Sequence, residues 1–180
     1  MAVYSFLQHT ISYPRICYYI ASTMLAFQRK KLTVKPKFVE SYKQRFFNDP
    51  LHICFGCSHT NPLGLKLDFY TTDQDGVGVK WHPKPGFESF PNIVHGGISG
   101  TLLDELGGVL IQAKLSKFAF TISSRIHYRS AIHSDRPVLG HAKILRKIGR
   151  NVLVEAVLHT EEGKVLSSMV GLYYIPTKKV

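Results

Sequence analysis

Cysteine, tryptophan and long apolar runs are all scarce in this chain of 180 residues. It has three cysteines, Cys17, Cys54 and Cys57, and one tryptophan. So few cysteines, in an odd number, exclude a disulfide-stapled scaffold and predict a reducing, cytoplasmic compartment. The apolar stretch Ile16–Phe27 falls short of the length that a membrane-spanning helix needs.

Acidic residues are absent from residues 1–39, which carry several Lys and Arg. Three interpretations remain open for this basic segment: an ordinary extension, a transit peptide to the mitochondrial matrix, or membrane contact through residues 1–37. The extension is the default interpretation. We therefore divide the chain into an N-terminal extension, residues 1–39, and one domain, residues 40–180.

Motifs of several large protein classes are also missing. The sequence has no P-loop, no G-x-S-x-G, no H-E-x-x-H and no zinc-finger or RNP signature. The net charge of +11 nevertheless implies attraction to polyanions. Because the charge is spread along the chain, we expect a phosphate-bearing small ligand and not nucleic acid. The candidates to hold its phosphates, against the alternative of a solvated basic face, are Arg125, Arg129, Arg146 and Arg150.

The pair Cys54-Phe-Gly-Cys57 has the spacing of a metal-binding knuckle. A structural zinc ion needs four ligands, and His52 and His59 lie too close in sequence to complete a standard site. A redox role lacks a thioredoxin-like context. We therefore expect the two cysteines to serve packing and turn formation, with no metal site and no cofactor.

The most informative stretch is the glycine-rich segment 94–113, which predicts a turn followed by one long helix. Its apolar residues fall on one face at helical spacing: Ile98, Leu102, Leu103, Leu106, Val109, Leu110 and Ala113. A second stripe is nearly free of bulk and has one carboxylate at its centre: Gly97, Gly100, Thr101, Asp104, Gly107 and Gly108. Glycine destabilises a helix interior, so this stripe predicts a close approach, either by another backbone or by a ligand.

Strand patterns lie on both sides of the predicted helix. Alternating or β-branched segments predict strands at 65–70, 76–81, 118–128, 137–148, 151–160 and 164–175, with a loop at 82–92. Two strands, one helix and four strands predict an α+β fold in which the helix lies across an antiparallel sheet.

Three motifs together carry a family resemblance. They are Cys54-x-x-Cys57-x-x-x-Asn61-Pro62-x-Gly64-Leu65-x-Leu67, Val94-His95-Gly96-Gly97 and Leu102-Leu103-Asp104-Glu105. In these residues the chain resembles the PaaI-like branch of the hot dog-fold acyl-CoA thioesterases, from about Cys54 to Ile175. The resemblance implies a hot dog fold, which is a long central helix wrapped by a curved antiparallel sheet.

The resemblance also implies a function and a site. The substrate would be an acyl-CoA, hydrolysed in a homodimer or a dimer-of-dimers tetramer with active sites between protomers. Asp104 matches the catalytic general base or nucleophile, Gly96 matches the backbone N–H donor to the thioester oxygen, and Thr121 matches a hydroxyl supplied by the neighbouring protomer.

His95 and Gly97 complete the turn next to the substrate, and we expect His95 mainly to hold that turn. Glu105 points away from the glycine stripe that contains Asp104, by helical geometry, so we expect no catalytic role for it. The alternative function is a non-catalytic hot dog protein that binds an acyl-CoA or another acyl thioester as a sensor.

Overall fold

The computed structural model describes residues 51–72 and 76–177. Both the predicted extension, residues 1–39, and its boundary with the domain therefore lie outside the described residues. All described residues belong to the unit Leu32–Val180. Within the described ranges, no helix combines the length and the apolar character needed to cross a membrane.

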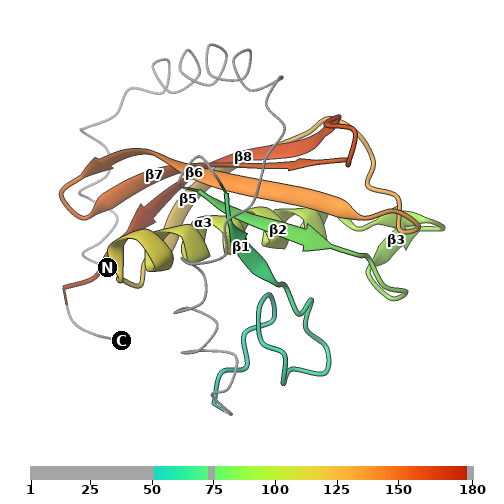
Figure 1. The fold of residues 1–180 in the computed structure, drawn as a ribbon, viewed down its shortest axis with the longest axis horizontal. Coiled ribbons are helices and arrows are strands. Elements are labelled where there is room, and N and C mark those ends of the chain that lie inside the picture. The colour runs from blue at the N-terminus through green and yellow to red at the C-terminus, as the bar shows by residue number, and fades with distance from the viewer. Residues whose placement is uncertain (1–50, 73–75, 178–180) are drawn as a thin grey trace. The chain divides into compact units, whose positions relative to one another are not determined.

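One six-stranded antiparallel sheet forms most of the described unit, in the order β1-β2-β6-β7-β8-β5. Its strands are β1 (Phe69–Thr71), β2 (Val77–Trp81), β5 (Phe120–Tyr128), β6 (Val138–Ile148), β7 (Asn151–His159) and β8 (Val165–Tyr174). Helix α3 (Gly96–Leu115) lies along one face of this sheet and contacts β2, β5, β6, β7 and β8 (Figure 1). The predicted hot dog architecture is confirmed.

The apolar face of α3 forms the centre of the core, as its periodicity predicts. Its buried apolar side chains are Leu102, Leu103, Leu106, Val109, Leu110 and Ile111. They pack against buried side chains of the sheet such as Val79, Val154 and Met169. Ser99 is also buried in this face, where its hydroxyl lies 2.8 Å from that of Ser167 on β8.

Two segments differ from the predicted strands and loop. The segment 82–92 was predicted as a loop, but it contains β3 (Glu88–Phe90), which pairs with β4 (Ile93–Val94) across a turn at Asn92, whose φ is 62°. This ribbon leads directly into α3. The predicted strand 65–70 pairs with β2 only from Phe69. Leu65 and Leu67 instead donate their N–H groups to the carbonyls of Phe55 and Gly56, in the segment 52–57, which we call the cysteine loop.

The glycine stripe of α3 has two different explanations. A side chain on Gly107 would place its Cβ 2.1 Å from the hydroxyl oxygen of Tyr173, so the sheet itself makes the close approach there. At Gly108 no heavy atom of the described residues lies within 4 Å of that position. Gly107 therefore belongs to the packing surface of α3, and Gly108 belongs to its open surface.

Alanine substitutions should separate these two glycines. Gly107→Ala is expected to lower the free energy of unfolding by about 1–3 kcal/mol, because the added methyl collides with the Tyr173 ring. Gly108→Ala is the matched control and should keep or raise stability, since alanine favours a helix interior by about 1 kcal/mol over glycine. Urea unfolding of both variants measures the difference, and equal effects would contradict the packing described here.

Candidate active site

Helix α3 begins with a turn that exposes backbone N–H groups. His95 is the N-cap residue, and its Nδ1 accepts a hydrogen bond of 2.9 Å from the N–H of Gly97. His95 thus holds the turn, as expected from the sequence. Gly96 is the first helical residue and is exposed, so its N–H lies at the positive end of the helix dipole. This N–H is able to donate to an anionic or polarised oxygen.

Asp104 lies two turns further along the same helix, and two hydroxyl groups hold its carboxylate. Thr121 Oγ1 donates to Asp104 Oδ1 at 2.6 Å, and the Tyr173 hydroxyl donates to the same oxygen at 3.0 Å. Thr121 on β5 and Tyr173 on β8 are paired directly across the two strands. Three elements therefore converge on one carboxylate oxygen.

Tyr173 is the member of this group that sequence reasoning missed. Its hydroxyl lies 3.1 Å from the backbone carbonyl oxygen of Asp104 as well as beside the carboxylate. Burial, and then the neighbouring Asp104 charge, raises the pKa of Tyr173, so the phenol stays protonated and remains a donor. In the sequence, Gly107 was the one indication that a large side chain approaches the helix here, because its missing side chain makes room for the Tyr173 ring.

Thr121 differs from the expectation in one respect. The resemblance placed its hydroxyl on a neighbouring protomer, whereas Thr121 here reaches the Asp104 of its own chain. The reason is that β5 follows α3 directly and pairs with β8, which returns it to the Asp104 side of the helix. Asp104 is exposed in the single chain, so described residues of one chain do not build an apolar slot around it.

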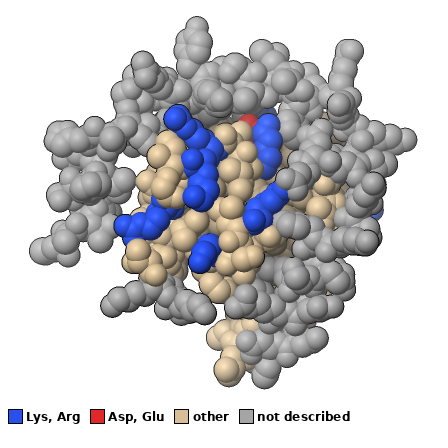
Figure 2. All heavy atoms as spheres, turned by 60° about the vertical axis from the view of Figure 1, so that its left-hand side comes forward, with Lys and Arg blue, Asp and Glu red and all other residues tan. Residues whose placement is uncertain are grey.

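The four predicted phosphate-binding arginines lie in different parts of the sheet. Arg146, near the end of β6, and Arg150, in the β6–β7 turn, share one end, where the Arg150 guanidinium lies 5.2 Å from the centroid of the Tyr174 ring. Arg125 lies within β5, and Arg129 comes directly after the C-terminal residue of that strand. Figure 2 shows Lys and Arg gathered on one face, with little acidic surface in view among the described residues.

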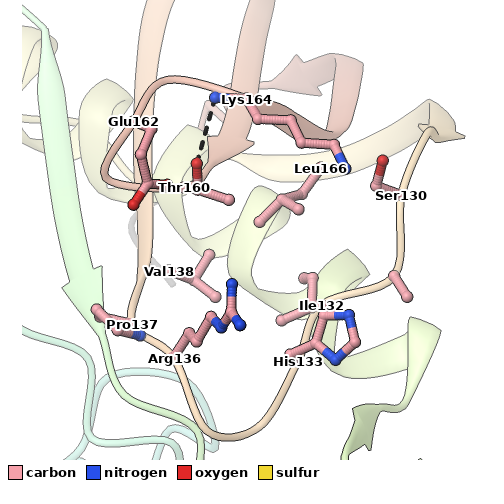
Figure 3. A pocket seen from close by; sticks show the side chains of 11 residues that line it. Ser130, Ile132, His133, Arg136, Pro137, Val138, Thr160, Glu162, Lys164 and Leu166 are labelled. Carbon is pink, nitrogen blue, oxygen red and sulfur yellow. Dashed lines mark hydrogen bonds between the residues drawn. The ribbon is translucent and has the colours of Figure 1, made fainter.

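A surface pocket of about 490 Å³ lies apart from the predicted site. Its walls are the segment 130–133, the segment 136–138 and residues of the β7–β8 connection (Figure 3). Arg136 and Lys164 give it positive charge, and Glu162 lies on the same rim. None of the residues predicted for the active site lines this pocket.

Glu105 points to the opposite flank of α3 from the Asp104 site and meets the cysteine loop. Cys54 Sγ lies 3.2 Å from Glu105 Oε1. Burial, followed by the Cys54 charge, raises the pKa of Glu105 to about 8. Hydrogen bonding by the Cys57 side chain is the first cause that lowers the pKa of Cys54 to about 5.

Comparison with known proteins finds similarity to one superfamily. Residues 91–167, which include all of α3 and most of β5–β8, match the model of the thioesterase superfamily. A search of curated proteins gave no match.

Solved structures agree on the fold. A crystal structure of a thioesterase superfamily protein superimposes with a TM-score of 0.62 at 17% identity, covering 93% of this chain and 80% of that one. The PaaI protein of Escherichia coli gives 0.59 at 12% identity, covering 64% and 83%. A Streptococcus mutans protein solved with acetyl-CoA gives 0.56 at 16% identity, covering 63% and 91%. Residues 91–167 are therefore similar to the thioesterase superfamily, and the described part of the chain has the fold of these solved structures.

Proposed function

We propose that this protein is an acyl-CoA thioesterase that hydrolyses an acyl-CoA to the free acid and CoA. The observation that carries the proposal is the exposed Asp104 carboxylate, held through Oδ1 by Thr121 and Tyr173. Two donors on one oxygen orient the carboxylate and leave its second oxygen, Oδ2, to accept a proton from water. An oriented carboxylate next to open helix surface is what a general base requires.

In this mechanism Asp104 Oδ2 takes a proton from a water molecule as the water oxygen adds to the thioester carbonyl carbon. The negative charge that develops on the carbonyl oxygen is stabilised by the N–H of Gly96. The C–S bond then breaks, and CoA leaves as a thiolate that takes up the proton. A thiol has a pKa of about 8.5, so its departure needs no strong general acid. Direct attack by the Asp104 carboxylate through an anhydride is the alternative route.

We infer from the spacing of these two groups that a second copy of the chain completes the site. Gly96 and Asp104 are eight residues apart on one helix, which corresponds to about 12 Å along its axis. One thioester group spans only a few ångströms, so it cannot touch both groups of the same helix. We therefore place the Gly96 N–H of one protomer opposite the Asp104 of its partner, in a homodimer or a dimer of dimers.

The surface beside Asp104 supports such a dimer. β5 is an edge strand of the sheet, and all but one of its residues are exposed. Its exposed side chains include Phe120, Ile122 and Tyr128, and Phe118 is exposed just before it. An uncovered edge strand with large apolar side chains is a surface that a second copy would bury.

The positive charge of the protein suits the phosphate groups of a CoA substrate. CoA carries phosphates, and Arg125, Arg129, Arg146 and Arg150 are our candidates to bind them. Arg146 and Arg150, which share one end of the sheet, are the pair best placed to act together. The acetyl-CoA bound by the structurally similar S. mutans protein supports a CoA thioester as the ligand class.

Replacing the proposed base tests the enzymatic function. Asp104→Asn keeps the size and the hydrogen-bond acceptor of the side chain but removes its charge, so kcat for acyl-CoA hydrolysis should fall at least ~10²-fold. The assay follows CoA release across a panel of acyl chain lengths. Asp135→Asn, the same change at an exposed aspartate that lies 3.7 Å from Arg136, is the matched control and should retain most of the activity.

Turnover in Asp104→Asn equal to that of the wild type would overturn this assignment. Binding of acyl-CoA by the wild type without any hydrolysis would instead identify a sensor protein.

Mixing two inactive variants tests the shared site. Gly96→Pro removes only the N–H, because proline is tolerated at the first helical position and His95 already has the extended backbone that precedes proline. Gly96→Ala keeps the N–H and is its control, since an added Cβ lies 3.7 Å from Tyr128, an ordinary contact. Gly96→Pro alone should lose ~10²–10³-fold in kcat.

Equal amounts of Gly96→Pro and Asp104→Asn chains, unfolded and refolded together, should regain about a quarter of the wild-type activity. Half of the dimers would then be mixed, and each mixed dimer would contain one intact site. No recovery in a mixture shown to contain mixed dimers would mean that both groups act within one chain.

A further inference from the structure

We propose that Cys54, Cys57 and Glu105, with His52 as the fourth ligand, bind a zinc ion that fastens the cysteine loop to helix α3. The cysteine loop is the segment 52–57. This site is separate from the proposed thioesterase site, and it does not depend on that function.

The distances among the donor atoms fit one ion. One sulfur of each cysteine and one carboxylate oxygen of Glu105 all lie within 4.8 Å of one another. Two neighbouring contacts are shorter: 3.2 Å from Cys54 Sγ to Glu105 Oε1, and 3.4 Å from His52 Nε2 to Cys57 Sγ. In a tetrahedral zinc site with the usual bond lengths, neighbouring ligand atoms are about 3.5–3.8 Å apart. Cys54, Cys57 and Glu105 therefore already lie close enough to share one ion, and His52, next to Cys57, turns toward the other two ligands to complete the site.

The backbone holds the cysteine loop in place before any ion binds. The Ser58 N–H donates to the Cys54 carbonyl at 3.1 Å, which closes the turn between the two cysteines. The N–H groups of Leu65 and Leu67 bind the carbonyls of Phe55 and Gly56 at 2.8 and 3.0 Å. The ligands are thus presented on a fixed turn and not on a free strand of chain, which lowers the entropy lost on binding.

Gly56 fits the loop closely onto the helix. A Cβ on this residue would lie 2.3 Å from Glu105 Cδ, so any side chain here would push the carboxylate out of the cluster. The loop and the helix thus approach each other at a point where both offer metal ligands.

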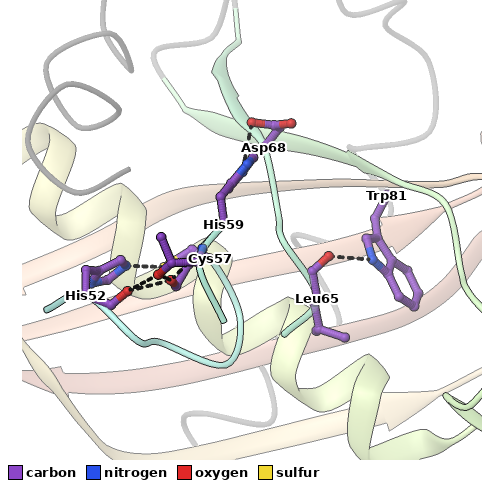
Figure 4. Close-up of polar contacts among 8 residues, drawn as sticks. His52, Cys57, His59, Leu65, Asp68 and Trp81 are labelled. Atoms are coloured by element: carbon purple, nitrogen blue, oxygen red, sulfur yellow. Dashed lines mark hydrogen bonds and ion pairs between the residues drawn. The ribbon is translucent and has the colours of Figure 1, made fainter. Parts of the chain in front are cut away.

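Figure 4 shows that His52 and His59, on either side of the cysteine pair, have different neighbours. His52 lies beside Cys57, with its carbonyl accepting a hydrogen bond from Ser58 Oγ at 2.5 Å. His59 is turned toward Asp68, and its Nε2 lies 3.5 Å from that carboxylate. His52 is therefore the fourth ligand, and His59 is the matched control.

The chemistry of the donors selects zinc. Two thiolates exclude magnesium and calcium, which prefer oxygen ligands. An imidazole and a carboxylate beside the thiolates favour zinc over copper(I), which prefers sulfur alone. The site has four protein ligands, which is the composition of a structural zinc site and not of a catalytic one.

Cobalt(II) provides a direct test on the full-length protein, treated with chelator under reducing conditions. One equivalent should bind and give a thiolate-to-cobalt charge-transfer band together with the intense d–d bands of tetrahedral coordination. Zinc should displace the cobalt stoichiometrically. Cys54→Ser and Cys57→Ser should each remove most of the charge-transfer band, and Glu105→Gln and His52→Gln should weaken binding at least ~10-fold.

The control His59→Gln should bind cobalt like the wild type. Circular dichroism of the metal-free variants establishes that each is folded, and the wild-type titration needs no variant at all. The proposal is overturned if the wild type gives no charge-transfer band, or if His59→Gln weakens binding as much as His52→Gln. It is also overturned if Cys54 and Cys57 form a disulfide when the reducing agent is removed in the presence of zinc. Because metal binding is read directly, failure of thioester hydrolysis would leave this result unaffected.

Discussion

The contact between the Tyr173 ring and the bare backbone of Gly107 determines how the rest of the candidate site is arranged. Since residue 107 has no side chain, β8 approaches α3 closely enough for the Tyr173 hydroxyl to reach both the carboxylate and the carbonyl of Asp104. Strand pairing then brings Thr121 to the same oxygen. A single missing methyl group thus allows three elements to meet at one acid.

Two adjacent carboxylates on α3 face different surroundings. Successive residues of a helix point about 100° apart, so Asp104 faces the exposed side next to β5 while Glu105 faces the cysteine loop. Hydroxyl donors surround the first carboxylate, and sulfur and burial surround the second. The helix therefore presents two carboxylates with different surroundings within one turn, and its apolar face packs against the sheet.

The length of α3 links the fold to assembly. Its exposed N–H groups and its carboxylate are two turns apart, and the edge strand beside them presents apolar side chains to solvent. In a single chain these features have no common partner. Two-fold pairing of the chain along this edge would cover the apolar side chains and bring the two polar groups together from different copies.

Periodicity in the sequence determined the helix, its buried face and the long strands, because a repeat of 3.6 or 2 residues reports directly which side chains leave water. It also placed Asp104 at the centre of the glycine stripe, whereas Gly96 and Thr121 were identified only through the family resemblance. Only the tertiary structure decided that Tyr173 donates to Asp104 and that Thr121 does so within its own chain. It alone also joined Glu105 to cysteines some fifty residues away. These contacts form between elements that are distant in sequence, and no local pattern of residues encodes the distance across a sheet or between a loop and a helix.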